Sequence, residues 1–282
     1  MANSPNCAVC GETRPRTEVY QVRGYSICRC PACGVGSTVI PKDFNPATIY
    51  EEGYFQGGQS DGYADYIGTE QVLRQEFRAA LQKLRSAGVQ SGRLLEVGCA
   101  YGFFLQEARA YFDCLGLEVA PSAVEYARSR GLDVREGVAD TATLKPLGQF
   151  DSIVMLDVIE HLPNPIETLG ALAGSALPGA ALMISTGDWN SMLSRCMGKK
   201  WRLMTPPQHL FFFTPNSITR LLEQAGFRVV SIQKPWKTVP IGLMAYQLGN
   251  RVGMRLGFLE KIGSFGLPVN LFDAMRVIAR KA

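Results

Sequence analysis

The sequence lacks the features that direct a protein to a membrane or to nucleic acid. No uncharged apolar run is long enough to cross a bilayer, and no apolar segment follows a basic start, so we expect neither a transmembrane helix nor a leader peptide. The formal net charge is only +4, and lysine and arginine do not cluster beside aromatic residues. We therefore expect a cytoplasmic protein whose partner is not a nucleic acid.

Cysteine is scarce in most of the chain and concentrated at its beginning, where five of the eight cysteines lie in the first 33 residues. Cys7 with Cys10 and Cys30 with Cys33 form two C-x-x-C pairs, each followed by glycine, which is the spacing of a tetrahedral zinc site. Disulfides are the alternative, and they fit poorly with a reducing compartment. Cys28 could compete with Cys30 but lacks the paired spacing. Residues 1–42 are therefore predicted to be a zinc ribbon, in which a structural Zn²⁺ compensates for a small core.

Two glycines mark a turn at the centre of the chain. Residues 94–105 begin as an apolar strand and continue as a helical pattern, with Gly98 and Gly102 between the two. Glycine lets a ligand approach the backbone and meet the unpaired N–H groups of a helix start, which suits an anionic or carboxylate-bearing cofactor. A second strand, 114–119, ends near Glu118, whose carboxylate can accept two hydrogen bonds from a ribose diol. The glycine spacing is not the G-x-G-x-x-G of nicotinamide sites.

Three stretches resemble motifs of class I S-adenosylmethionine-dependent methyltransferases: EVGCAYG at 96–102, GLEVAPSAVEYA at 116–127 and FDSIVMLDVIEHLPNP at 150–165. The resemblance covers roughly residues 60–235 and implies S-adenosylmethionine as the cofactor. It departs from the family at Ala100, where the loop usually carries glycine. The residues that it assigns to the cofactor are Glu96, Gly98, Cys99, Ala100, Gly102, Glu118, Asp140 and Asp157.

Two of these assignments stay open. Asp140 follows a third strand at 134–138, and it either reaches the adenine amino group or is an ordinary surface residue. Asp157 lies at the carboxyl end of a fourth strand, the edge at which open parallel sheets bind ligands. It either touches the methionine ammonium group or only shapes the cleft.

Strands and helices alternate with short links from residue 69 onward, which favours a doubly wound α/β sheet. The expected fold is a seven-stranded Rossmann-like methyltransferase sheet behind a small zinc ribbon. The expected domains are the ribbon at 1–42, an aromatic linker at 43–68 and a methyltransferase domain at 69–282. The expected strands are the first half of 94–105, then 114–119, 134–138, 150–156, 179–185, 227–232 and 272–279, and the expected helices are 69–86, 102–111, 121–130, 165–176 and 215–225.

Three segments lie outside this alternation: residues 43–68, 186–214 and 236–268. The first is rich in aromatic residues and is either a linker that rests on the core or a lid over the cleft. The other two are predicted to be lid insertions that hold the substrate, with a membrane-surface role as the alternative for 236–268. Candidate substrate contacts in these segments are Tyr54, Tyr63, Tyr66 and Trp201.

The chain has only two histidines. His161 lies in an EHLP segment where methyltransferases commonly place a histidine, and we favour a hydrogen-bonded structural role over substrate contact. His209 lies in a loop rich in aromatic residues and proline. Its segment is similar to the His-Leu-x-x-Phe stretch of zinc-containing sugar C-methyltransferases, and the resemblance implies a histidine in the active site. His209 is the candidate proton acceptor, or else a group that orients the substrate.

The expected function is O- or C-methylation of a small or carrier-borne metabolite, such as a natural product, a sugar or a polysaccharide precursor. The main alternative is a ribosomal RNA methyltransferase, because some of these enzymes also begin with a zinc ribbon. Arg14, Arg16, Arg23 and Arg29 keep this alternative open. A non-enzymatic interaction protein with a vestigial fold would have a broken cofactor loop, yet Glu96 and Glu118 are both present.

Overall fold

A computed structural model of the chain describes residues 6–41, 67–240 and 266–282. The aromatic segment with Tyr54, Tyr63 and Tyr66, and most of the predicted insertion at 236–268, lie outside these residues. No helix in the described ranges is long and apolar enough to cross a membrane.

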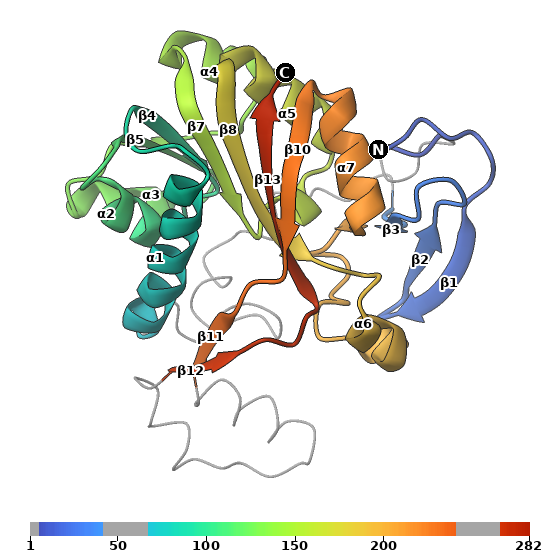
Figure 1. The fold of residues 1–282 in the computed structure, drawn as a ribbon. Helices are drawn as coiled ribbons and strands as arrows, with labels where there is room; N and C mark the ends of the chain where they lie inside the picture. Colours follow the sequence, from blue (N-terminus) through green and yellow to red (C-terminus); the bar gives the residue numbers. More distant parts are fainter. Residues whose placement is uncertain (1–5, 42–66, 241–265) are drawn as a thin grey trace.

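A seven-stranded sheet forms the centre of the molecule (Figure 1). All of its strands are parallel except β13, which is antiparallel to both of its neighbours. The predicted α/β class with seven strands is thereby confirmed. In spatial order the strands are β10 (Phe227–Gln233), β13 (Ala274–Lys281), β8 (Ala176–Gly187), β7 (Phe150–Leu156), β4 (Arg93–Val97), β5 (Asp113–Glu118) and β6 (Val134–Glu136).

Helices cover both faces of this sheet, and each face has its own apolar core. One core joins the sheet to α1 (Glu70–Ser86), α2 (Phe103–Ala108) and α3 (Pro121–Ser129). The other joins it to α4 (Thr141–Leu144), α5 (Pro165–Ser175) and α7 (Pro215–Gln224). The central strands are buried on both faces, which explains why they read as continuous apolar runs in the sequence.

Local signals fix where the helices begin. Pro121, Pro165 and Pro215 each occupy the first turn of a helix, where a missing N–H group costs nothing. Thr214 and Ser217 form a reciprocal capping box at the start of α7. These helices run toward the far edge of the sheet and leave the carboxyl ends of the parallel strands together at one edge.

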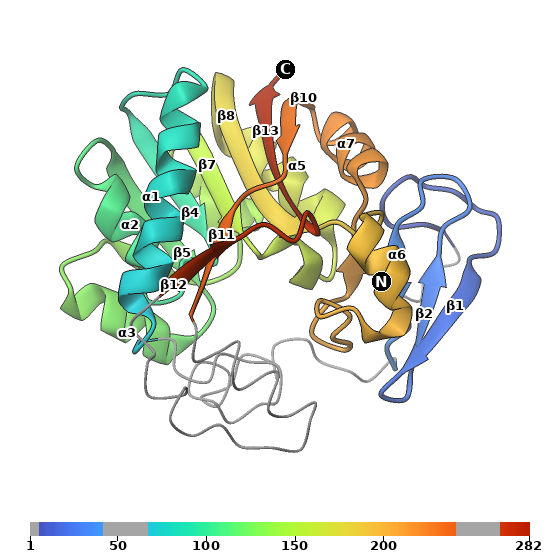
Figure 2. The same ribbon diagram turned by 60° about the horizontal axis from the view of Figure 1, so that its bottom comes forward.

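The N-terminal ribbon is joined to the core through a shared sheet. Its strands β1 (Thr17–Val22), β2 (Tyr25–Arg29) and β3 (Gly36–Thr38) are extended by β9 (Phe211–Phe212), which comes from the 186–214 insertion. Figure 2 shows the ribbon beside α6 (Met192–Met197) and α7, at the β10 end of the sheet. The ribbon and the insertion therefore form one structural unit.

A short hairpin extends from the edge of the central sheet at which the parallel strands end. Its strands β11 (Lys237–Pro240) and β12 (Gly266–Val269) pair antiparallel, and β11 packs near α1. Figure 2 shows the hairpin crossing the edge at which the parallel strands end. The hairpin thus marks one border of the region where a ligand of this fold would lie.

Candidate active site

The loop between β4 and α2 has the backbone conformation of a tight turn. Gly98, Ala100 and Gly102 all have positive φ angles, of 69°, 46° and 76°. A Cβ atom at Gly98 would lie 2.6 Å from Val158 Cγ2, and one at Gly102 would lie 2.3 Å from Leu132 Cδ1. Conformation therefore favours glycine at both positions, and the stiff, β-branched Val158 also limits the space at Gly98. Ala100 adopts the left-handed region at a cost of roughly 1–2 kcal/mol, which explains why glycine is common there in the family that the sequence resembles.

Glu118 ties this loop to the end of β5. One carboxylate oxygen accepts a hydrogen bond from the N–H of Ala100 at 2.8 Å, and the other accepts from Val119 at 2.8 Å and Ala120 at 3.0 Å. Burial raises the pKa of Glu118, and these three donors oppose the rise. A carboxylate offers about four acceptor positions, so Glu118 retains capacity for the ribose hydroxyl that the resemblance assigns to it.

Glu96 lies beneath the same loop. Its side chain is only 3% exposed, and its Oε2 atom has no hydrogen-bond partner within the described residues. Burial, and secondarily the charge of Glu118, raise its pKa well above the ordinary value. A turn held open by positive φ angles, an acid at the end of the second strand and an incompletely bonded buried carboxyl together fit S-adenosylmethionine.

The other two predicted cofactor acids differ in setting. Asp140 is exposed and accepts a hydrogen bond from the N–H of Thr143 at 2.8 Å, which caps α4 and lowers its pKa. Asp157 ends β7 with a φ of 56° and receives a hydrogen bond from Ser185 Oγ at 3.0 Å. Asp157 therefore lies at the edge that also carries Gly98 and Glu118, and contact of either aspartate with the cofactor stays a prediction.

Three polar side chains converge just beyond Asp157. One potential metal-ligand atom from each of Glu160, His161 and His209 lies within 4.8 Å of the other two. The two imidazole rings are 4.8 Å apart, centre to centre. The sequence places the segment 158–161, with Glu160 and His161, at the cleft, but it does not single out Glu160 or predict its approach to His209. Two imidazoles and a carboxylate at this spacing could hold a divalent cation.

Hydrogen bonds fix the tautomer of each ring. Nδ1 of His161 lies 2.9 Å from the carbonyl oxygen of Gln208, and Nδ1 of His209 lies 2.8 Å from that of Leu203. Because a carbonyl oxygen only accepts, each Nδ1 carries the proton and each Nε2 keeps its lone pair. Burial lowers the pKa of His209 to about 3, with a further decrease from His161, and burial also lowers the pKa of His161. Both rings are therefore neutral acceptors at physiological pH.

The N-terminal ribbon positions the loop that carries His209. Thr38 Oγ1 in β3 donates a hydrogen bond to the carbonyl oxygen of His209 at 2.6 Å. The next residue, Leu210, accepts from the N–H of Thr38 and donates to the carbonyl oxygen of Glu160. The ribbon thus contacts the loop directly, and the loop in turn is bonded to the Glu160 segment.

The four predicted zinc ligands come together beside the start of α7, where Asn216 Nδ2 donates a hydrogen bond to the carbonyl oxygen of Cys33. Their sulfur atoms all lie within 4.8 Å of one another, with Cys7 and Cys33 3.8 Å apart and Cys10 and Cys30 3.7 Å apart. Cys28 lies in β2 and is not part of this group. Four thiols in a compact cluster have the donor set of a structural zinc ion.

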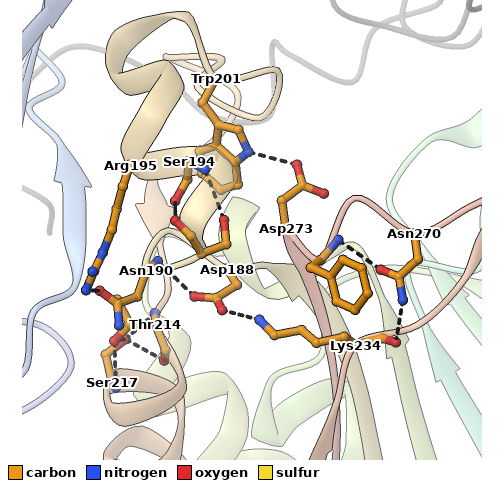
Figure 3. A network of polar contacts seen from close by, with 12 residues as sticks. Asp188, Asn190, Ser194, Arg195, Trp201, Thr214, Ser217, Lys234, Asn270 and Asp273 are labelled. Atoms are coloured by element: carbon orange, nitrogen blue, oxygen red, sulfur yellow. Dashed lines mark hydrogen bonds and ion pairs between the residues drawn. The ribbon is translucent and has the colours of Figure 1, made fainter.

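Trp201 belongs to a network of hydrogen bonds that holds the 186–214 insertion against the edge of the sheet (Figure 3). Its indole N–H donates to Asp273 at 2.8 Å, and its side chain is 3% exposed. Asp188, at the end of β8, pairs with Lys234 and accepts from the N–H of Asn190. The burial of Trp201 gives it a positioning role, and direct contact with substrate stays a prediction.

Comparison with known proteins agrees with this geometry. A family model described as a methyltransferase domain matches residues 17–232. A ubiquinone biosynthesis O-methyltransferase of Dinoroseobacter shibae is 31% identical over 179 residues, covering 59% of this chain and 70% of the relative. Its counterpart in Aromatoleum aromaticum is 26% identical over 161 residues, covering 52% and 69%.

Solved structures extend the agreement to the fold. A SAM-dependent methyltransferase from Archaeoglobus fulgidus superposes with a TM-score of 0.54 at 20% sequence identity, covering 77% of this chain and 99% of that one. At that identity the likeness concerns the fold alone. Since the family model spans well over half of the sequence, the chain belongs to the methyltransferase domain family and is an S-adenosylmethionine-dependent methyltransferase.

Proposed function

We propose that the protein transfers the methyl group of S-adenosylmethionine to a hydroxyl oxygen of a small or carrier-borne metabolite. The observation that carries this proposal is the convergence of Glu160, His161 and His209 beside the carboxyl end of β7. The names of the curated relatives, which are O-methyltransferases, support oxygen rather than carbon as the acceptor atom. The natural-product, sugar and polysaccharide pathways expected from the sequence remain candidate sources of the substrate.

The chemistry needs a positioned nucleophile more than an elaborate catalyst. The sulfonium methyl group is already electrophilic, so the protein must align the acceptor oxygen with the S–CH₃ bond and exclude water. Each neutral Nε2 atom of His161 and His209 carries one lone pair, which can accept a hydrogen bond from the acceptor hydroxyl or bind a cation, but not both at once.

His209 is a weak base on its own. A phenolic hydroxyl has a pKa of about 10, so its proton transfer to an imidazole with a pKa of about 3 is uphill by roughly seven units. A divalent cation held by Glu160, His161 and His209 would supply the positive charge that lowers the pKa of a bound hydroxyl. We therefore propose cation-assisted methylation, in which the Nε2 lone pair of His209 would bind the cation, and the cation rather than His209 itself would hold the acceptor hydroxyl.

The test is methyl transfer from labelled S-adenosylmethionine to a panel of catechols, phenols and sugars. The protein is first treated with EDTA and then supplied with Mg²⁺ or Mn²⁺. We expect transfer to a hydroxyl that EDTA abolishes and a cation restores. Full activity in EDTA would reject the cation, and the absence of transfer to any hydroxyl would reject O-methylation.

A variant separates the acceptor site from the cofactor site. His209→Gln is expected to lower methyl transfer by about 10²–10⁴-fold, the usual range for a positioned polar group at the reacting atom. Calorimetric titration with S-adenosylhomocysteine should give the wild-type affinity, because His209 contacts neither the glycine turn nor Glu118. Unchanged transfer in this variant would remove His209 from the active site.

We also infer that Cys7, Cys10, Cys30 and Cys33 bind a structural Zn²⁺. Metal analysis should give about one zinc per chain, and Cys30→Ser should lose it, with Cys196→Ser as the control because Cys196 is exposed and outside the group. Since the ribbon bonds to the His209 loop through Thr38, zinc loss should lower methyl transfer more than cofactor affinity. Zinc content that survives Cys30→Ser would contradict the site.

Three of the four arginines that keep the RNA alternative open make contacts within the protein. Arg14 pairs with Glu12, Arg16 donates to Ser37, and Arg29 lies over the ring of Trp189. The names of the curated relatives favour a small-molecule acceptor, and this is the proposal that we carry forward.

A further inference from the structure

One arginine is buried beside the proposed acceptor site without a hydrogen-bonding partner. Arg276 in β13 is only 4% exposed, and its Nε atom has no acceptor. Within the ranges 6–41, 67–240 and 266–282, this Nε atom is shielded from solvent and makes no hydrogen bond. A buried guanidinium group retains its charge and offers five N–H donors, so leaving it unbonded costs free energy.

Two other arginines in the same region, in contrast, donate hydrogen bonds to the protein. Arg202 makes two bonds to the carboxylate of Asp273, at 2.9 and 3.0 Å. Arg280 lies four residues along β13, on the same face as Arg276, and donates to the carbonyl oxygens of Gly179 and Ala87. The fold thus provides acceptors for neighbouring arginines and provides none for Arg276. This difference indicates that the partner of Arg276 is a ligand.

The position of Arg276 points to the acceptor side of the cleft. It lies opposite Ser185 in β8, and Ser185 bonds to Asp157 at the end of β7. Its electrostatic neighbours are Asp157 and Glu76 of α1, and the charge of Asp157 also acts on both histidines. β8 and β7 separate β13 from β4, which carries the cofactor loop. Arg276 and the histidines therefore lie around Asp157, on the side away from Glu118.

We propose that Arg276 binds an oxyanion, a carboxylate or phosphate group, of the acceptor molecule. A guanidinium group recognises such a group through two parallel N–H···O bonds, which fixes orientation as well as affinity. The anion anchored at Arg276 and the hydroxyl held near His209 would then be two points on one substrate. Asp157 and Glu76 offset the charge of the arginine without occupying its donors. This inference rests on the proposed function, and it adds an acidic acceptor to it.

The test compares two probes that differ by one charge. Protein saturated with S-adenosylhomocysteine is titrated calorimetrically with 3,4-dihydroxybenzoate and with catechol. We expect the wild type to bind the carboxylate probe at least tenfold more tightly. Arg276→Gln should abolish this preference and Arg276→Lys should retain part of it, while the control Arg280→Gln, at the opposite end of the strand, should retain all of it. An equal preference in wild type and Arg276→Gln, or none in the wild type, would overturn the proposal.

Thermal unfolding distinguishes a ligand-binding arginine from a structural one. Removing an unbonded buried charge should leave the Tm of Arg276→Met unchanged or raise it, whereas a structural arginine would lower it. A marked fall in Tm without ligand would count against the proposal.

The cofactor is the other possible source of a carboxylate. Arg276→Gln could weaken the binding of S-adenosylhomocysteine but not that of methylthioadenosine, which lacks the carboxylate. In that case the anion belongs to the cofactor, and the acceptor assignment is overturned. The outcome is also separable from the proposed function. If no hydroxyl is methylated but the charge preference persists and depends on Arg276, O-methylation fails and the anion site stands.

Discussion

The two halves of the sheet edge satisfy their polar groups in opposite ways. On the β4–β5 side, the carboxylate of Glu118 is bonded to three backbone N–H groups, and the loop from Gly98 to Gly102 packs against neighbouring side chains. On the β7–β13 side, the Nδ1 atoms of His161 and His209 bond to backbone carbonyl oxygens, and the Nε atom of Arg276 has no hydrogen bond within the described residues.

We infer from this contrast that the two sides of the sheet edge bind different molecules. We assign the β4–β5 side to the cofactor and call it the cofactor half, because a cofactor shared by the whole family can be bound largely by backbone geometry. We assign the β7–β13 side to the acceptor and call it the acceptor half, because its side chains can be exchanged between enzymes without altering the turn. Changes in the first half should therefore act on cofactor affinity and stability, and changes in the second on methyl transfer.

The largest effect on cofactor affinity should come from Gly98→Ala. The new Cβ would lie 2.6 Å from Val158 Cγ2, in a backbone conformation with a φ of 69°. We expect the free energy of unfolding to fall by about 1–3 kcal/mol and S-adenosylhomocysteine affinity to fall at least tenfold. The control is Gly170→Ala in α5, where nothing lies within 4 Å and φ is not positive. Wild-type affinity in Gly98→Ala would show that the turn does not bind the cofactor.

A smaller loss of affinity is expected for Glu118→Gln. The amide NH₂ group would face an N–H donor where a carboxylate oxygen now accepts one, so the loop would lose part of its anchoring. Calorimetry should show S-adenosylhomocysteine binding about tenfold more weakly. Glu136→Gln, the exposed neighbour of Glu118 in β6, should bind normally. Equal affinities in the two variants would place the ribose elsewhere.

The cofactor half was largely predictable because its signals are local. Apolar runs mark the central strands, glycines mark the turn, and Ala100, which stands where the family's loop usually carries glycine, has a φ of 46°. The four cysteines likewise follow from spacing alone, since a C-x-x-C pair places two thiols on one turn.

The acceptor half was less predictable because its groups meet only through tertiary structure. The pairing of β3 with β9 joins segments far apart in the sequence, and no local pattern records it. Arg276 looks like an ordinary charge at the end of a strand until its burial is known. The sequence places Glu160 beside His161 at the cleft, but the approach of Glu160 to His209 depends on how the 186–214 insertion folds back.

Glu96 is an exception to the contrast, because it belongs to the cofactor half yet has an unbonded Oε2. Its pKa is raised in the folded state, so its neutral form contributes stability below the unfolded pKa, and that contribution is lost as pH rises toward the folded pKa. Glu96→Gln cannot ionise. We expect the Tm of the variant to exceed that of the wild type increasingly from pH 5 to pH 8. Parallel Tm curves over this range would show that Glu96 does not titrate between the two states.

The smallest effect should come from Ala100→Gly, which tests whether the turn carries strain. Ala100 has a φ of 46°, a conformation that glycine adopts without a Cβ clash. Relief of this clash is opposed by the greater freedom of glycine in the unfolded chain, so we expect a net gain of about 0.5–1 kcal/mol in the free energy of unfolding. Chemical denaturation measures that gain, and Ala171→Gly in α5 should instead lose stability. If Ala100→Gly loses as much as Ala171→Gly, the left-handed conformation carries no strain, and the departure from the family's glycine has no structural cost.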